Sequence, residues 1–240
     1  VSISPDSRYA LSGGADKTLK YWDLSTGKCL RTFTGHADNI HSVCFSPDGH
    51  YALSGSWELT KSIKYWDLST GHCLRTLSGH GNLFTLSVHP AGRVLLSGGY
   101  WNQLKLWNIT TGKCISSLTG HTGSVKSTAI SRNGRCALSG SRDKTLKSWD
   151  LKMGKCIRTL TGHTGVVLSV AFSPNGWYGL SGSNDMFLKY WDLKTGKCLR
   201  TLTGHTASVT SVSITPDGRY ALSGSGDKSL KLWYLGEPKK

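Results

Sequence analysis

Long hydrophobic runs are absent from this sequence of 240 residues. No stretch approaches the roughly 20 apolar residues that a membrane-spanning helix needs, so we expect no membrane span. The sequence opens at Val1 directly on a strand-like segment, and we expect no signal peptide. Because there is no initiator Met, we expect the chain to be part of a longer polypeptide.

Acidic residues and paired cysteines are also scarce. Asp and Glu number 14 against 29 Lys and Arg, which gives a formal net charge of +15. The seven Cys form an odd set without a CxxC pair, which argues against both a disulfide framework and a zinc site. We therefore expect free thiols in a reducing compartment, a cytoplasmic location, and no metal or other cofactor.

What the sequence does contain is one repeat, about 42 residues long, that covers the whole chain. Trp recurs at intervals of 41 to 44 residues, at Trp22, Trp66, Trp107, Trp149, Trp191 and Trp233. Gly-His recurs five times, and Leu-Ser-Gly recurs six times, beginning at Leu11, Leu53, Leu96, Leu138, Leu180 and Leu222. Five of the Cys keep the same spacing, which predicts a role in packing each module. A fixed period of this length is typical of repeat architectures.

Each repeat consists of four expected short strands separated by turns. In the last copy, apolar residues alternate along 208–214 and a Thr-Pro-Asp-Gly turn follows. Two further strands are expected over 220–223 and 230–235, and complete copies add a fourth, such as 198–202. Short runs between turn residues predict antiparallel β-structure, and the sequence shows no sustained helical period.

This pattern resembles the WD40 family, whose repeats of four strands have Gly-His and Trp-Asp marks. The resemblance implies an all-β WD40 β-propeller, in which four-stranded blades surround a channel. We expect a single domain over 1–240, with six blades at 1–34, 35–78, 79–119, 120–161, 162–203 and 204–240. Three positions depart from the family pattern: Asn108 and Tyr234 replace the Asp of Trp-Asp, and Arg132 replaces a turn Pro.

The sixth blade is predicted to be incomplete. The first three strands occur six times but the fourth only five times, so the last blade lacks its outer strand. Three explanations remain open. The parent chain holds a seventh blade, or an N-terminal strand outside this sequence completes a six-bladed ring, or another chain pairs with the open edge. We favour the first.

The resemblance also implies a buried hydrogen-bond chain in each regular blade, from Trp to Ser to His to Asp. Three blades contain all four residues: His121, Ser139, Asp143 and Trp149; His163, Ser181, Asp185 and Trp191; and His205, Ser223, Asp227 and Trp233. Ser, His and Asp also form hydrolase triads, but a catalytic set occurs once and opens on a pocket. No GxSxG elbow accompanies these residues. We therefore predict structural tetrads in a protein that is not an enzyme.

The four strands of a blade are called a to d in chain order, and the d–a connection leads from one blade to the next. The b–c turns, between the second and third strands, are irregular in two neighbouring blades. The turn at 56–62 is two residues longer than usual, and both it and the turn at 99–103 lose the regular Asp, for which Glu58 could substitute in blade 2. The d–a connection that leads into blade 3 is one residue short. In the family these two kinds of turn share the top face, where varied exposed residues are candidates for binding. The predicted partner-binding residues are Trp57, Glu58, Phe84, Tyr100, Trp101, Arg142, Asn184, His41 and Lys126. The alternative is that the aromatic rings only support the irregular loops.

We expect a non-catalytic scaffold or sensor module that binds protein partners through these top-face turns. A basic propeller that binds nucleic acid or another polyanion is the second hypothesis. It is not favoured, because much of the charge recurs with the repeat and is therefore dispersed, and dispersed charge binds phosphates weakly. A hydrolase is the least supported hypothesis. The open edge of blade 6 is a further candidate contact, for strand pairing with a missing segment of the parent chain or with another copy.

Overall fold

The computed structural model describes residues 1–59 and 62–236. Over these residues every regular element is a β-strand, and the strands form six antiparallel sheets, as the sequence predicts. The chain divides into two units, Val1–Ser117 with the sheets of blades 1 to 3 and Leu118–Lys240 with those of blades 4 to 6. No helix long and apolar enough to cross a bilayer occurs in the described part of the chain.

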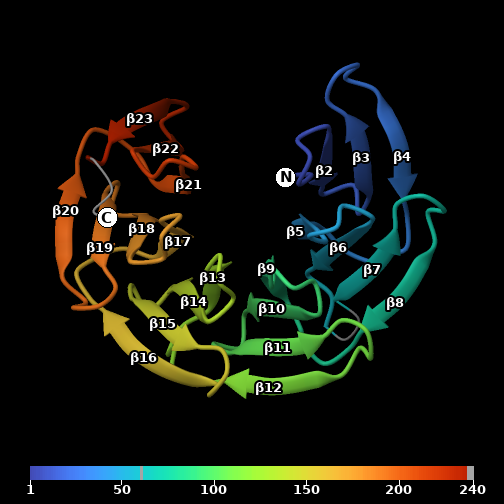
Figure 1. The fold of residues 1–240 in the computed structure, drawn as a ribbon, viewed down its shortest axis with the longest axis horizontal. Coiled ribbons are helices and arrows are strands. Elements are labelled where there is room, and N and C mark those ends of the chain that lie inside the picture. The colour runs from blue at the N-terminus through green and yellow to red at the C-terminus, as the bar shows by residue number, and fades with distance from the viewer. Residues whose placement is uncertain (60–61, 237–240) are drawn as a thin grey trace. The chain divides into compact units, whose positions relative to one another are not determined.

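Each sheet of the first unit has four strands that follow chain order (Figure 1). Blade 1 contains β1 (Ser2–Ile3), β2 (Tyr9–Gly13), β3 (Leu19–Asp23) and β4 (Cys29–Phe33). Blade 2 contains β5 (Ile40–Phe45), β6 (Tyr51–Ser56), β7 (Ile63–Asp67) and β8 (Cys73–Leu77). Blade 3 contains β9 (Leu83–Val88), β10 (Val94–Gly99), β11 (Leu104–Asn108) and β12 (Cys114–Leu118).

The second unit repeats this order, but its last sheet has three strands. Blade 4 contains β13 (Val125–Ile130), β14 (Cys136–Ser141), β15 (Leu146–Asp150) and β16 (Lys155–Leu160). Blade 5 contains β17 (Val167–Phe172), β18 (Tyr178–Ser183), β19 (Leu188–Asp192) and β20 (Cys198–Leu202). Blade 6 contains β21 (Val209–Ile214), β22 (Tyr220–Ser225) and β23 (Leu230–Tyr234).

The direction of the strands sorts the turns into two groups. Because neighbouring strands run antiparallel, the a–b and c–d turns lie at one end of each blade. The b–c turns and the d–a connections lie at the other end, which we call the top. The irregular turns of blades 2 and 3 therefore share the top of the first unit.

Neighbouring blades within a unit interlock through a small residue on the second strand. A Cβ added to Gly140 would lie 2.6 Å from Cγ1 of Val167, the first residue of strand β17 in the next blade. Gly182 meets Val209 in the same way, with the corresponding distance also 2.6 Å. The space of the missing side chain thus receives a buried side chain of the next blade. Such close fitting leaves few voids, and it explains why the Leu-Ser-Gly repeat ends on Gly.

Arginine side chains add a polar connection between neighbouring blades. The Arg31 guanidinium on β4 donates to the carbonyl oxygens of Ser69 and Thr70, at 2.8 and 3.0 Å, in the c–d turn of blade 2. Arg158 donates to Lys194 O at 2.8 Å, and Arg200 donates to Tyr234 O at 2.8 Å. These repeated Arg residues therefore hold the c–d turn of the next blade or, in blade 6, the end of strand β23. The sequence pattern alone does not reveal these contacts.

Blade 6 exposes an apolar surface that its neighbours bury. Leu230 is 72% exposed, whereas Leu188 at the same position of blade 5 is fully buried. Leu222 and Leu232 are also exposed, and among the described residues β23 pairs only with β22. The predicted absence of an outer strand from the last blade is therefore confirmed over residues 204–236, and 237–240 lie outside the described residues.

The seven cysteines are all free thiols. The prediction that the five repeated Cys pack each module is wrong, because these five are exposed. They begin or nearly begin the fourth strands, where the Sγ of Cys29 lies 3.4 Å from Arg31 O of the same strand. The fourth strand is at the edge of its sheet, so its outward residues meet solvent.

Candidate functional site

The residues of the predicted tetrads lie in hydrogen-bond contact in blades 4, 5 and 6. In blade 4, the Trp149 indole N–H donates to Ser139 Oγ at 2.8 Å, and Ser139 Oγ lies 2.7 Å from His121 Nε2. His121 Nδ1 lies 2.7 Å from Asp143 Oδ2. The corresponding bonds in blades 5 and 6 have the same lengths within 0.1 Å.

The charge of the carboxylate fixes the direction of this chain. Burial opposes ionisation of Asp143, but hydrogen bonds from His121 and Thr145 hold its pKa well below the ordinary value. An ionised carboxylate accepts only, so His121 donates from Nδ1 and accepts at Nε2 from the Ser139 hydroxyl. Ser139 is fully buried and its oxygen also accepts from the indole, so this hydroxyl is not available to a substrate.

Blade 2 has the same network with a longer acid. Glu58 Oε1 lies 2.7 Å from His36 Nδ1 and accepts from the Ala37 N–H at 2.9 Å. His36 Nε2 lies 2.7 Å from Ser54 Oγ, which accepts from Trp66 at 2.8 Å. Glu58 therefore occupies the place of the regular Asp. These contacts occupy the Glu58 carboxylate inside blade 2, so its role there is structural.

Blade 3 departs from the network. Trp101 follows Ser97 by four residues, the position that Asp or Glu58 holds elsewhere, and Asn102 has the positive φ of 61° found at the next position of regular turns. Trp107 still donates to Ser97 at 2.8 Å. His80 is buried, and its Nδ1 has no hydrogen-bond partner among residues 1–59 and 62–236.

The predicted aromatic residues form two groups at the top of the first unit. Trp57 and Phe84 meet edge to face, with ring centroids 4.8 Å apart, and His41 lies 5.5 Å from Trp57 and 6.0 Å from Phe84. Tyr100 and Trp101 form the second group, perpendicular at 5.8 Å. Trp57 and Phe84 are half-buried, whereas Tyr100 and Trp101 are 46% and 60% exposed. The first group thus supports the loops, while the second presents apolar surface.

Backbone hydrogen bonds join the two irregular turns through Asn82. The Asn82 N–H donates to Glu58 O, and the Tyr100 N–H donates to Asn82 O, both at 3.1 Å. Leu59, which sequence reasoning missed, is 72% exposed. A Cβ on Gly81 would lie 2.9 Å from Leu59 O and 3.1 Å from Trp101 Nε1, so these turns approach closely. Thr60 and Lys61 of the blade 2 turn lie outside the described residues.

The other predicted binding residues belong to the second unit. Arg142 and Asn184 are exposed on the b–c turns of blades 4 and 5. Lys126 on β13 is partly buried, and burial together with the Arg142 charge lowers its pKa. The structure therefore brings Lys126 and Arg142 near each other. It places Asn184 on the next blade of the same unit.

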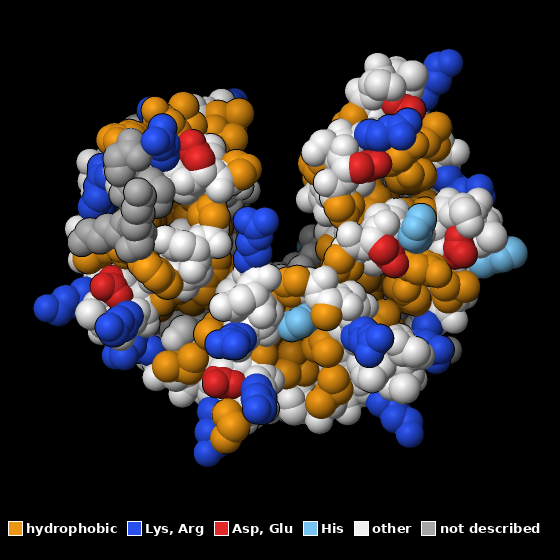
Figure 2. Space-filling view, viewed as in Figure 1, with side chains coloured by type: hydrophobic (Ala, Val, Ile, Leu, Met, Phe, Trp, Pro, Cys, Tyr) orange, Lys and Arg blue, Asp and Glu red, His pale blue; other side chains and the backbone are white. Residues whose placement is uncertain are grey.

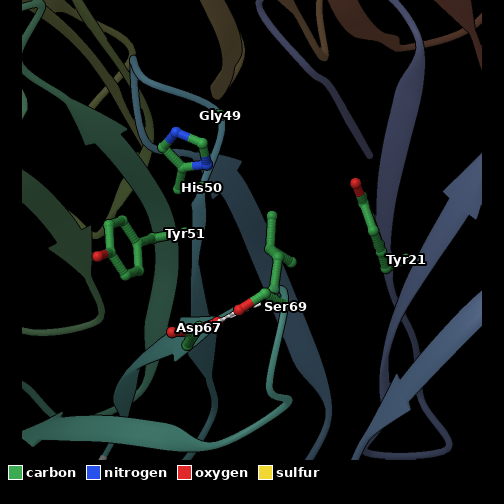
Figure 3. Close-up of a pocket in the computed structure, with 7 residues that line it drawn as sticks. Tyr21, Gly49, His50, Tyr51, Asp67 and Ser69 are labelled. Carbon is green, nitrogen blue, oxygen red and sulfur yellow. Dashed lines mark hydrogen bonds between the residues drawn. The ribbon is translucent and has the colours of Figure 1, made fainter.

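A cavity of about 370 Å³ lies at the opposite end of the first unit, between blades 1 and 2. Figure 3 shows Tyr21 on one side, with His50, Asp67 and Ser69 of blade 2 on the other. Asp67 accepts from the Ser69 hydroxyl at 2.6 Å and from the Ser69 and Thr70 N–H groups. Its carboxylate therefore stabilises the c–d turn, and the cavity lacks an available acid.

Positive charge is dispersed over both units. On the face that Figure 2 shows, Lys and Arg side chains of each unit are scattered among hydrophobic and uncharged ones. No group of three His, Cys, Asp or Glu side chains suited to a metal ion occurs within the described ranges.

One protein-family model matches nearly the whole chain, and individual known proteins match shorter stretches. The family model for the WD domain, G-beta repeat, matches residues 1–23, 27–67, 71–108, 112–150, 154–192 and 196–234. A Lissencephaly-1 homolog of Heterostelium pallidum is 46% identical over 46 residues, which are 19% of this chain and 11% of that protein. The nuclear distribution protein PAC1 of Mycosarcoma maydis is 39% identical over 54 residues, 22% of this chain and 12% of that protein. Periodic tryptophan protein 2 of Arabidopsis thaliana is 28% identical over 98 residues, 41% of this chain and 11% of that protein. The matched stretches thus span about a tenth of these relatives.

Proposed function

Because the chain belongs to the WD domain, G-beta repeat family, we propose that it is a protein-interaction scaffold whose binding surface lies on the top of blades 2 and 3. Members of the family generally serve as protein-binding scaffolds and not as enzymes. The surface consists of Leu59, Tyr100 and Trp101, which we call the apolar rim, and the half-buried pair Trp57 and Phe84 lies in the same two blades.

The observation that carries this proposal is the exposure of Tyr100 and Trp101 next to Leu59. Large aromatic side chains supply much of the energy at protein interfaces, because they bury a large area with few rotatable bonds. A neighbouring group of apolar side chains in the solvent is a mark of an interaction site. The Asn82 N–H donates to Glu58 O and the Tyr100 N–H donates to Asn82 O, so backbone hydrogen bonds join the turns that carry the rim.

A peptide selection tests this proposal. Peptides selected from a random displayed library for binding to the intact protein are tested against the double variant Tyr100→Ala, Trp101→Ala. We expect at least about a tenfold loss of affinity, since Trp and Tyr are enriched among hot-spot residues, whose loss costs about 2 kcal/mol or more, and ~1.4 kcal/mol is tenfold in affinity. Trp177→Ala is the matched control, because Trp177 is 52% exposed but follows an a–b turn at the opposite end. Equal binding to the double variant and the unchanged protein would contradict the proposal.

The polyanion hypothesis has less support. Arg31, Arg158 and Arg200 donate to backbone carbonyls of the next blade, so these repeated charges already have structural partners. Titration with single- and double-stranded nucleic acid across salt concentrations separates the two functions. Binding to phosphates would strengthen steeply as salt falls, whereas binding through the apolar rim would not.

Blade 6 supports a second interaction. We propose that the edge and apolar face at β23 receive a further strand, from another segment of the parent polypeptide or from another copy. The edge of β23 favours it, because an unpaired strand edge promotes pairing and β23 pairs only with β22 among the described residues. The exposed Leu230 and Leu232 favour a cover for the face, since the equivalent Leu188 and Tyr190 are buried in a cluster that includes Val209 of the next blade. Sedimentation of the 240-residue chain tests the second source: self-association that Leu232→Glu abolishes supports pairing between copies, and a monomer at all concentrations excludes it.

A further inference from the structure

The a–b turns of blades 4 and 5 differ in charge from the same turn of blades 1, 2 and 6. Those three blades have Pro-Asp in this turn, at 5–6, 47–48 and 216–217. Blade 4 has Arg132-Asn133 and blade 5 has Pro174-Asn175. An amide has thus replaced the carboxylate in two neighbouring blades, and a basic residue has replaced the Pro that the other five blades share. The changes remove negative charge and add positive charge at one place.

The turn itself does not require the carboxylate. In blade 2, Asp48 Oδ1 accepts from a hydroxyl and from the backbone N–H two residues later, the second at 3.0 Å. In blade 4, Asn133 Oδ1 accepts the equivalent bonds, from the Ser131 hydroxyl at 2.8 Å and from the Arg135 N–H at 3.0 Å. The amide therefore preserves the turn. It changes only the other atom of the side-chain head, from an oxygen that accepts to a nitrogen that donates.

Backbone donors fix the orientation of both amides. The Trp177 N–H donates to Asn175 Oδ1 at 3.1 Å, as the Arg135 N–H does to Asn133 Oδ1. A backbone N–H only donates, so the amide oxygen faces it and the amide nitrogen is the atom left over. Both Asn residues are exposed, and neither Nδ2 has a hydrogen-bond partner within residues 1–59 and 62–236. Each turn therefore has an amide donor that the fold does not use.

The Arg132 guanidinium is a third unused donor. Arg31 and Arg158 donate to carbonyl oxygens of the next blade. Arg132 is instead exposed, and its side chain has no hydrogen bond or ion pair within the part of the chain that the structure describes. Pro at this turn position stabilises a fold because it restricts the unfolded chain. Blade 4 lacks that contribution and has a charge in its place, and no contact within the protein accounts for the exchange.

A cavity of about 220 Å³ lies between the two turns. It is lined by Ser131, Arg132, Asn133, Pro174, Asn175 and Gly176. The lining residues thus include a guanidinium and two amides but no carboxylate. A water molecule occupies about 30 Å³ in the liquid, so the cavity has room for a group of several heavy atoms. Because the Arg132 charge repels cations and attracts anions, the cavity favours an anion that accepts hydrogen bonds.

We propose that this cavity binds the phosphoryl group of a phosphate monoester, with Arg132, Asn133 and Asn175 as its donors. Such a group carries about −1.5 to −2 charges at pH 7 and presents three acceptor oxygens. A guanidinium donates two parallel N–H bonds to a phosphate, and the two amides supply further donors. A carboxylate has one charge and two oxygens, so it matches three donor side chains less well. The site belongs to the second unit and is independent of the apolar rim of blades 2 and 3.

Three small probes that differ in charge test the ligand class: methyl phosphate, dimethyl phosphate and acetate. The side-chain amide NMR signals of Asn133 and Asn175 are followed in the intact chain at constant ionic strength and about pH 7.5, above the second phosphate pKa of ~6. We expect methyl phosphate to shift both amides and to bind at least about tenfold more tightly than the two singly charged probes, because charge-assisted hydrogen bonds are the stronger ones. Equal affinities for the three probes would overturn the proposal.

Two further probes separate the sources of the phosphoryl group. The peptide acetyl-Gly-phosphoserine-Gly-amide represents a phosphorylated protein partner, and inorganic phosphate represents the free ion. Tighter binding of the peptide supports a phosphorylated partner, whereas binding of inorganic phosphate at least as tight as that of the peptide supports the free ion. If neither probe shifts the amide signals, the proposal is overturned.

Variants that restore the common turn residues provide an independent measurement. Arg132→Pro is expected to weaken binding of methyl phosphate at least about tenfold, and it should leave stability unchanged or higher, since five blades have Pro there. Asn133→Asp returns the carboxylate and is expected to abolish binding by repulsion. Urea unfolding of each variant checks that the fold is intact.

Arg135→Gln is the matched control for charge. Arg135 is an exposed Arg close to Arg132 in the same a–b connection, but it does not line the cavity. Its replacement should change the affinity for methyl phosphate less than about twofold, because charges in solvent interact weakly. Binding that survives both Arg132→Pro and Asn133→Asp would overturn the assignment, as would an equal loss of affinity on Arg135→Gln.

Discussion

Blades 2 and 3 lie next to each other in one unit, and both have irregular b–c turns. The equivalent buried histidine nevertheless has different hydrogen bonds in the two blades. In blade 2 the longer turn returns an acid, Glu58, to His36 Nδ1 at 2.7 Å. In blade 3 the shorter d–a connection and the substitution by Trp101 leave His80 Nδ1 without a partner in the described chain. A turn can therefore change length and keep the network, provided that it still delivers a carboxylate.

The largest expected effect comes from removing the acid of blade 2. Glu58→Ala leaves His36 Nδ1, the Ala37 N–H and the Ser56 hydroxyl without their acceptor. We expect a loss of about 3 kcal/mol of unfolding free energy, since unpaired buried donors cost ~1–3 kcal/mol each. Urea unfolding measures the loss, with Leu59→Ala as the exposed neighbouring control. A change of less than ~1 kcal/mol would mean that blade 2, like blade 3, is stable without an acid beside its histidine.

The next effect is the contribution of each histidine to the pH dependence of the unfolding free energy, which differs between His80 and His36. The pKa of His80 is about 4 in the folded chain, against ~6.5 in an unfolded one. Between these values the unfolded state binds more protons, so the stability linked to neutral His80 is complete above pH ~6.5 and is lost as pH falls towards ~4.

We expect His80→Gln to flatten the curve of unfolding free energy against pH in that window, by up to ~1.4 kcal/mol for each pH unit. Burial also lowers the pKa of His36, but Glu58 opposes the shift, so His36→Gln should flatten the curve less. Parallel curves for the unchanged protein and His80→Gln would refute the difference in environment.

The third prediction is a loss of stability on Gly99→Ser, although the repeat pattern favours Ser at this position. Ser follows Leu-Ser-Gly in four blades, at Ser56, Ser141, Ser183 and Ser225, and blade 3 has Gly99. Gly99→Ser restores the common residue, yet its Cβ would lie 2.6 Å from Asn82 O and 2.7 Å from His80 Cε1. We expect a loss of about 2 kcal/mol from overpacking.

The control for that change is Gly14→Ser in blade 1, where the closest atom to an added Cβ is Asp16 Oδ1 of a flexible side chain. Its expected cost is below ~1 kcal/mol, because the neighbour can move. Thermal unfolding of both variants makes the comparison, and a Gly99→Ser protein as stable as the unchanged one would show that the His80 ring is not held there.

The smallest effect distinguishes supporting rings from presenting ones. Trp57→Ala should cost about 1–2 kcal/mol, because it removes a half-buried ring that packs edge to face on Phe84. Trp101→Ala should change stability by less than ~0.5 kcal/mol, as is usual for exposed positions. Equal losses in chemical unfolding would favour the alternative that all of these rings only support the loops.

Much of this molecule could be predicted from its repeat. The alternation of apolar residues and turn residues determines the strands, because each strand buries one set of side chains and each turn has its own backbone requirement. The spacing of Trp, Ser, His and Asp likewise predicts the contacts found at His121, since all four lie within one local module. The loss of the regular acid from blade 3 is also visible in the sequence, at Trp101.

Only the tertiary structure decided what that loss produces. The one-residue shortening before Leu83 can be counted in the sequence, but the place of the His80 ring depends on Gly99 and Asn82, which come from separate turns. The cavity lined by Arg132 and Asn175 and the exposure of Leu59 likewise depend on how turns of two blades meet. A sequence specifies local periodicity directly, whereas the fit between irregular loops is settled by packing among residues far apart in the chain.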